Sequence, residues 1–206
     1  MPQVLKPEIR ARILNAGLEV FAAQGYLGAT MNAIAEQAGL GAASLYRYFP
    51  SKAELFEAAI PAEVAARFER LLKQRVIALA RQPAPAAFRP KSDYGGEMLE
   101  FWLEHRLAVV VLLDRARGSA YEHYGERFVA LLVKSTLEQI RNAGTNVPIT
   151  PAARLVLTRI FENTRSTLAA ILAHSHDPRA LRDAIEGFWS YQIPGLHGFA
   201  RWVRKE

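Results

Sequence analysis

The sequence predicts an all-α protein built from two helical domains. Apolar residues recur three or four positions apart along almost the whole chain, which is the spacing of one helix face. Segments rich in Val, Ile and Thr and bounded by turn residues, which would indicate strands, are missing. We therefore expect a small three-helix domain over residues 1–56 and a larger helical domain over residues 57–206, divided within the fourth helix.

The first three helices have recognisable ends. Apolar spacing places the first helix before Gly25, a suitable left-handed cap, and Thr30 can cap the second. Residues 39–41, Gly-Leu-Gly, make a turn before a very short third helix over residues 42–48. Pro50 prevents that helix from continuing.

A fourth helix begins at once, because Ser51 and Glu54 have the spacing of a capping box. It spans residues 52–81 with an interruption at Pro61, which is either a hinge or a static kink. Further helices are expected over residues 92–105, 107–116, 119–142, 151–173 and 178–193.

Prolines and cap residues mark the later connections. Three prolines within residues 83–90 indicate an irregular segment, and residues 142–148 read as a loop. Thr150 caps the helix that follows. Pro194 is expected to break or kink the last long helix before a short final stretch.

Composition excludes several classes of protein. The chain has no cysteine, which excludes disulfides, thiolate zinc sites and cysteine nucleophiles. Residues 1–6 hold no long apolar run, so no signal peptide is expected. The longest apolar stretch, residues 107–113, is too short to span a bilayer. We expect a soluble cytoplasmic protein with no membrane partner.

Catalytic, cofactor and metal sites are not expected either. The chain has no Gly-rich phosphate loop, no Gly-x-Ser-x-Gly elbow and no recognisable carboxylate pair. The run His174-Ser175-His176-Asp177 contains metal-ligating residue types, but histidines two apart cannot share a helix face. Asp177 has the position of a helix cap, so a loop is the better interpretation.

The net charge of +6 does not by itself indicate a nucleic-acid partner. Residues 1–56 hold five basic and four acidic side chains. The placement of a few side chains is more informative. Leu45 and Phe49, four apart, face inward on the third helix, which leaves Tyr46 and Arg47 facing outward. A short helix of this kind fits the major groove of DNA.

The motif Leu-Tyr-x-Tyr-Phe-x-Ser-Lys at residues 45–52, with the preceding spacing of apolar and glycine residues, resembles the N-terminal domain of TetR-type transcriptional regulators (the TetR/AcrR family) over about residues 8–56. The resemblance implies binding to double-stranded operator DNA. It implies base contacts from Ala42, Ala43 and Tyr46, and backbone contacts from Thr30, Ser44, Arg47, Tyr48 and Lys52.

Two features qualify this motif. A cation in the first turn of a helix, such as Lys52, opposes the macrodipole, and a bound phosphate would compensate it. Gly41 stands where such regulators usually have a Ser or Thr cap, and Ala42 where a longer side chain is common. The third helix is therefore poor in hydrogen-bonding groups.

The resemblance also implies a homodimer, formed through the last two long helices, and a small-molecule effector. Intramolecular core is the alternative for part of the apolar residues on those helices, namely Leu155, Leu168, Ile171, Leu172, Leu181, Ile185 and Phe188. Interleaved aromatic and polar residues are the candidates for an effector pocket: Phe101, Trp102, His105, Tyr121, Tyr124, Arg159 and Asn163.

The leading interpretation is a ligand-responsive repressor in which the fourth helix carries the signal. Two alternatives stay open. One is a small all-α enzyme or ligand carrier with a vestigial helix-turn-helix. The other is a co-regulator that pairs with another protein and no longer reads DNA. Neither the operator nor the effector can be named from the sequence.

Overall fold

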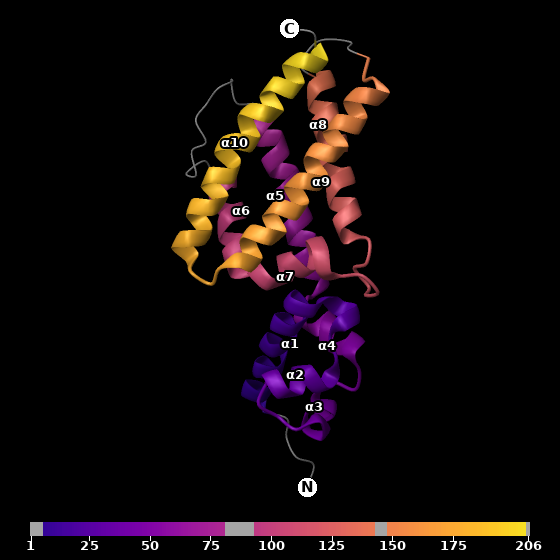
Figure 1. Cartoon of the computed structure of the whole chain (residues 1–206), viewed down its shortest axis with the longest axis vertical. Helices are drawn as coiled ribbons and strands as arrows, with labels where there is room; N and C mark the ends of the chain where they lie inside the picture. Colours follow the sequence, from indigo (N-terminus) through magenta and orange to yellow (C-terminus); the bar gives the residue numbers. More distant parts are fainter. Residues whose placement is uncertain (1–5, 81–92, 143–147, 205–206) are drawn as a thin grey trace.

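The protein is described by a computed structural model that covers residues 6–80, 93–142 and 148–204, and every regular element in these ranges is a helix. The all-α prediction is thereby confirmed. The helices form two bundles placed end to end, α1–α4 and α5–α10 (Figure 1). None of the described helices is long and apolar enough to cross a membrane. The predicted proline-rich connection lies outside the described residues, as does most of the predicted loop at 142–148.

The N-terminal helices begin and end close to where the sequence places them. Their bounds are α1 Pro7–Gly28, α2 Met31–Gln37, α3 Ala42–Tyr48 and α4 Lys52–Ala59. Gly25 has φ 72°, so the backbone of α1 leaves the helical region there, and one more turn follows. The Thr30 Oγ1 accepts a hydrogen bond from the Ala33 N–H at 3.1 Å, and Gly39 turns the chain with φ 63°.

The larger bundle begins after an interruption at the predicted proline. Ile60 leaves the helical region, with φ −126° and ψ 78°, and Pro61 precedes the next helix. The remaining elements are α5 Ala62–Ala80, α6 Asp93–Glu104, α7 Arg106–Val110, the π-helix η1 Val111–Arg115, α8 Tyr124–Asn142, α9 Pro151–His174 and α10 Pro178–Arg204.

The predicted helices over 107–116 and 119–142 need correction. The first is α7 followed by the single π-helical turn η1, and α8 starts only at Tyr124. Gly118 has φ 82°, which ends any helix before it. The Ser119 hydroxyl then donates to the Ala116 carbonyl at 2.6 Å and accepts the Tyr121 N–H at 3.0 Å. Residues 116–123 are therefore a hydrogen-bonded turn instead of a helix start.

Pro194 was predicted to break or kink the last long helix, and the break is wrong. The last helix, α10, continues through Pro194 to Arg204. Proline removes one backbone donor from a helix, but a helix of 27 residues keeps most of its other hydrogen bonds. Pro194 is exposed, so no neighbouring element has to accommodate its ring.

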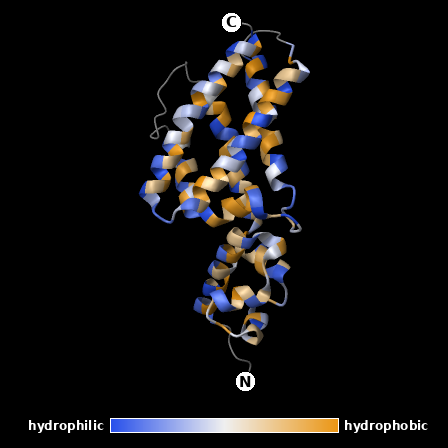
Figure 2. Cartoon of the chain, in the orientation of Figure 1, coloured by the Kyte–Doolittle hydropathy of each residue, from blue (hydrophilic) through white to orange (hydrophobic). Residues whose placement is uncertain are grey.

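One continuous core runs through both bundles. Phe21 and Phe56 pack edge to face in the small bundle, with ring centroids 5.0 Å apart, and Phe68 and Phe101 stack at 5.5 Å in the large one. Figure 2 shows hydrophobic and hydrophilic residues on different sides of the helices. The C-terminal part of α1 packs against η1, so the segment before α8 joins the two bundles.

Candidate nucleic-acid interface and sensor residues

The third helix buries one face and exposes the other, as its sequence predicts. Leu45 is fully buried and Phe49 is 4% exposed, so both belong to the core of the small bundle. Tyr46 is 48% exposed although it is large and partly apolar. Ala43 and Arg47 are exposed as well, and Ala42 and Ser44 are half-buried. This surface has the size and shape that a major groove accepts.

Polar groups surround the exposed face of α3. The Tyr48 hydroxyl accepts a hydrogen bond from the backbone N–H of Lys6 at 3.1 Å, which ties the start of α1 to the end of α3. The Arg47 Nη2 donates to the Ser44 Oγ at 3.2 Å. Thr30 accepts a bond through its oxygen, so its hydroxyl proton remains available for a phosphate.

Lys52 has internal partners that the sequence did not reveal. Its ammonium group donates to the carbonyl oxygens of Tyr26 at 2.7 Å and Ala29 at 2.8 Å, and lies 4.4 Å from the centroid of the Tyr26 ring. These acceptors compensate a cation at a helix start, as the predicted phosphate would. Two of the three ammonium protons are used, so one remains for a phosphate. The direct DNA contact stays a prediction.

This arrangement is a helix-turn-helix with an exposed third helix, and comparisons with known proteins agree. Residues 13–59 match the family described as bacterial regulatory proteins, tetR family. The N-terminal domain of this chain belongs to the tetR family. This chain, which carries the TetR-family domain at residues 13–59, is 44% identical over 64 residues to the HTH-type transcriptional repressor KstR of Mycolicibacterium smegmatis, a match that covers 31% of the chain. It is 43% identical over 53 residues, 26% of the chain, to the HTH-type transcriptional regulator SrpR of Pseudomonas putida.

Each of these two matches covers less than a third of this chain. The matched segment spans 29% of the length of KstR and 25% of the length of SrpR. A crystal structure of a TetR-like transcriptional regulator from Rhodococcus sp. RHA1 resembles the fold over the whole chain. It is 22% identical, the match covers 99% of this chain and 100% of that one, and the TM-score is 0.52.

The seven residues predicted for an effector pocket lie in three different places. Phe101 and Trp102 on α6 are buried, and His105, which follows α6, is half-buried. The His105 ring packs 4.8 Å from that of Phe101, and Trp102 stacks on Trp189 of α10 at 6.1 Å. The buried Trp102 Nε1 has no hydrogen-bond partner among the described residues. Such a group is unusual and marks a place where a ligand acceptor would be favourable.

Tyr121 lies at the junction between the two bundles, and Tyr124 joins α8 to α5 within the large one. The Tyr121 hydroxyl donates to the Ile60 carbonyl at 3.3 Å, and the Tyr124 hydroxyl donates to the Ala65 carbonyl at 3.1 Å. Burial is the main cause that raises the pKa of both phenols, because it disfavours the phenolate. For Tyr121 the carboxylates of Glu57 and Glu63 act in the same direction. Both hydroxyls therefore have structural partners.

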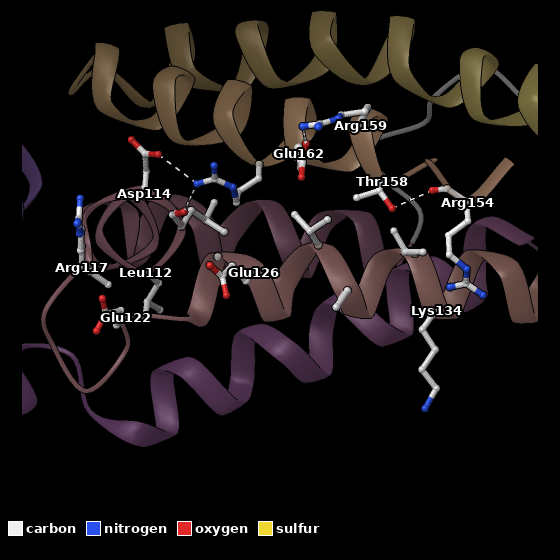
Figure 3. Close-up of a pocket in the computed structure, with 17 residues that line it drawn as sticks. Leu112, Asp114, Arg117, Glu122, Glu126, Lys134, Arg154, Thr158, Arg159 and Glu162 are labelled. Atoms are coloured by element: carbon white, nitrogen blue, oxygen red, sulfur yellow. Dashed lines mark hydrogen bonds and ion pairs between the residues drawn. The ribbon is translucent and has the colours of Figure 1, made fainter. Parts of the chain in front are cut away.

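Arg159 and Asn163 lie on the exposed face of α9, away from the aromatic groups on α6. Arg159 forms an ion pair with Glu162 at 2.6 Å. It also lines an open groove of about 710 Å³ between η1, α8 and α9, shown in Figure 3. Arg159 is the one residue of the predicted seven that lines this groove. The groove could not be predicted from the sequence, because charged residues on amphipathic helices ordinarily face solvent.

The histidine-containing run is partly a loop: His174 ends α9, and the predicted loop is confined to residues 175–177. Asp177 caps α10 through bonds from the N–H groups of Arg179 and Ala180, at 3.0 and 3.4 Å. His176 Nδ1 lies 2.9 Å from the Arg106 Nη2. Among the described residues no group of three or more His, Asp or Glu side chains could hold a metal ion.

Proposed function

We propose that this chain is a ligand-responsive transcriptional regulator that binds palindromic operator DNA as a homodimer, and that it acts as a repressor released by a small-molecule inducer. The observation that carries the proposal is the division of α3: Leu45 is fully buried, whereas Tyr46 on the same helix is 48% exposed. A helix that presents a large aromatic residue to solvent at the end of an elongated molecule is well placed to enter a DNA groove.

In this proposal the exposed residues divide into two roles. Ala42, Ala43 and Tyr46 contact base edges and thymine methyl groups, and the hydroxyl and cationic groups contact phosphates. The phosphate contacts come from Thr30, Ser44, Arg47, Tyr48 and Lys52. Because Gly41 leaves α3 without a side-chain cap and Ala42 is small, few hydrogen bonds to bases are available. Specificity then depends on Tyr46 and on the pairing of two half-sites.

The homodimer is supported by apolar residues that one chain leaves exposed on its last two helices. Leu155 and Val156 on α9 are 59% and 43% exposed, and Tyr191 and Trp202 on α10 are 76% and 55% exposed. Gly187, Gly195 and Gly198 have open space beside them. Large exposed apolar side chains next to glycines permit close approach of a second copy. In contrast, Leu168, Leu172, Leu181 and Ile185 are buried within the chain, as the intramolecular alternative requires.

Effector release is supported by two features near the break between α4 and α5. The break at Pro61 allows the small bundle to change its angle, and the Tyr121 bond to Ile60 connects that break to the large bundle. The buried, unpartnered indole N–H of Trp102 is the strongest of the predicted effector contacts. The relatives KstR, which are named repressors, favour repression over activation.

Binding of the purified chain to DNA upstream of its own gene tests the proposal. We expect a dimer to bind that DNA more tightly than scrambled DNA of equal length, with an affinity that falls log-linearly with salt. Equal affinity for both DNAs would contradict specific regulation. Loss of all DNA binding by a correctly folded dimer would favour the co-regulator. Turnover or stoichiometric ligand capture without DNA binding would favour the enzyme or carrier.

A further inference from the structure

The groove between η1, α8 and α9 has the dimensions of a ligand site. Its volume of about 710 Å³ lies within the range of about 300–1,000 Å³ that small-molecule sites occupy. It extends along α8 from Gly125 to Lys134, a helix length of about 14 Å. One wall is η1, a single π-helical turn, and such turns occur often at functional sites.

Two arginine side chains along the groove are ion-paired, whereas two cations at one end have no ion pair among the described residues. Arg165 bonds to the Leu113 carbonyl at 2.5 Å and to Asp114 at 3.1 Å, and Arg159 is paired with Glu162. In contrast, Lys134 and Arg154 have no ion pair in the part of the chain that the structure describes. Figure 3 shows these two cations together at the end of the groove opposite Asp114 and Arg117.

The two unpaired cations lie where a bound anion would be stabilised both by their charges and by the dipole of α9. Arg154 follows the Thr150 cap of α9 by four positions, so it is close to the positive end of the helix dipole. A cation there is disfavoured, and an anion held between Arg154 and Lys134 would interact favourably with both side chains and with the dipole. Between this end and η1 the groove is lined by Val129, Ala130 and Val133 of α8.

We propose that this groove binds a small organic anion, with its carboxylate or phosphate at Lys134 and Arg154 and its apolar body along Val129, Ala130 and Val133 toward η1. The central charges do not compete for the head group, because Arg159 and Arg165 already have carboxylate partners. The site is distinct from the Trp102 region, and apart from Arg159 it uses none of the residues that the sequence suggested for an effector.

A ligand in the groove could act on the TetR-family domain through residues 114–118, which contact α1. Asp114, Ala116 and Arg117 line the groove. The carbonyl oxygen of the intervening Arg115 lies 3.6 Å from where a Cβ on Gly25 of α1 would be. A Cβ on Gly118 would lie 2.5 Å from the Leu27 side chain, so the contact there is also tight. A ligand that moves residues 114–118 must therefore displace the end of α1, which Lys52 joins to α4.

Binding is tested first without DNA, by titrating the full-length chain with four octyl compounds: octanoate, octyl phosphate, octanol and octylamine. We expect both anions to bind at least about tenfold more tightly than the alcohol and the amine, the relative strength of the two anions showing which head group is preferred. The variant carrying Lys134→Gln and Arg154→Gln should lose about tenfold in affinity for the anions and keep its affinity for octanol. Arg141→Gln, an exposed cation elsewhere on α8, is the matched control and should change nothing.

Two outcomes would contradict the proposed anion site. One is equal affinity for octanol and the two anions, and the other is unchanged anion affinity in the double variant. Thermal unfolding of the double variant shows whether it is folded, and the exposed positions 134 and 154 make a large loss of stability unexpected. Single substitutions repeat the test if the double variant is unstable.

The route to α1 rests on the proposed DNA-binding function, so it is measured separately. With the groove saturated by the tighter octyl anion, the affinity for upstream DNA should change at least about fivefold in the native chain and remain unchanged in the double variant. An anion that binds in the predicted way and leaves the DNA affinity unchanged would contradict the route but keep the site. A chain that binds the anion and no DNA would contradict the proposed function alone.

Discussion

The ammonium group of Lys52 lies 4.4 Å from the centroid of the Tyr26 ring and donates a hydrogen bond to the carbonyl oxygen of the same residue at 2.7 Å. The same ammonium group donates a second hydrogen bond to the Ala29 carbonyl oxygen at 2.8 Å. Tyr26 and Ala29 flank the end of α1, and Lys52 is the first residue of α4. The Lys52 side chain therefore joins α1, which contacts η1, to α4, which follows the exposed helix α3.

Replacing Lys52 with Gln should destabilise the protein and weaken DNA binding together. The substitution removes two charge-assisted bonds and leaves partly buried carbonyls without them, at about 1.5–3 kcal/mol. Urea unfolding measures this loss, and Arg12→Gln, an exposed change on α1, is the control. If the third ammonium proton reaches a phosphate, the salt slope of DNA binding also falls by about one. A variant as stable as the native chain would contradict the structural role.

Replacing Tyr46 with Ala should change which DNA sequences are preferred and leave stability nearly unchanged. The side chain is 48% exposed, so little core packing is lost. If it contacts base edges, discrimination at one position of each half-site should fall by about 1–3 kcal/mol. Arg47→Gln is the comparison, because loss of a phosphate contact weakens all sequences alike. Selection from a randomised DNA library measures both, and identical preferences in Tyr46→Ala and the native chain would contradict the assignment.

The sequence was informative where local chemistry determines the structure. The Thr30 cap and the turn at Gly39 each depend on a few neighbouring residues, and the spacing of Leu45 and Phe49 determines which face of α3 is buried. These features are sufficient to define the helix-turn-helix.

Long-range contacts could not be predicted in the same way. A lysine at a helix start indicates an acceptor, but only the fold shows that carbonyl groups from α1 supply it for Lys52. Tyr121 and Tyr124 have the composition of a pocket, and their hydroxyls instead bind backbone carbonyls 61 and 59 residues away in sequence. The groove at η1 depends on how three helices pack, which periodicity does not report.

Stability should decline at alkaline pH because of the buried tyrosines. Burial raises the pKa of Tyr124, and also that of Tyr121, above the value of about 10 for an unfolded chain. The unfolded state therefore loses these protons first. The contribution of the two phenols to the free energy of unfolding is complete below about pH 10 and is lost as the pH rises further. Unfolding free energies at about pH 8 and about pH 10.5 measure the decline.

The variant Tyr124→Phe should show a smaller alkaline decline, although it is less stable at neutral pH because it lacks the bond to Ala65. Phe128→Leu is a control that destabilises the same core without removing a titratable group. Parallel pH profiles for the native chain and Tyr124→Phe would show that the phenol does not contribute.

A charge at Tyr191 should weaken the homodimer. Tyr191 is 76% exposed in one chain, so Tyr191→Asp should leave the fold of the monomer intact. At an interface the same change buries a carboxylate twice, once from each copy, and the dissociation constant should rise at least about tenfold. Sedimentation equilibrium measures it, with Gln24→Asp on α1 as a control of equal charge. An unchanged dissociation constant would place the interface elsewhere.

Replacing Gly125 with Ala should destabilise the protein, although helix propensity alone predicts the opposite sign. Alanine is favoured over glycine inside a helix by about 1 kcal/mol. At this position, however, the new Cβ would lie 2.6 Å from the Leu113 carbonyl oxygen and 3.2 Å from Arg165 Cδ. A backbone oxygen cannot move aside as a flexible side chain can, so η1 must shift away from α8 and the bond from Arg165 to Leu113 must lengthen. We expect a net loss of about 1–3 kcal/mol in urea unfolding, and a gain in stability would show that η1 is free to move relative to α8.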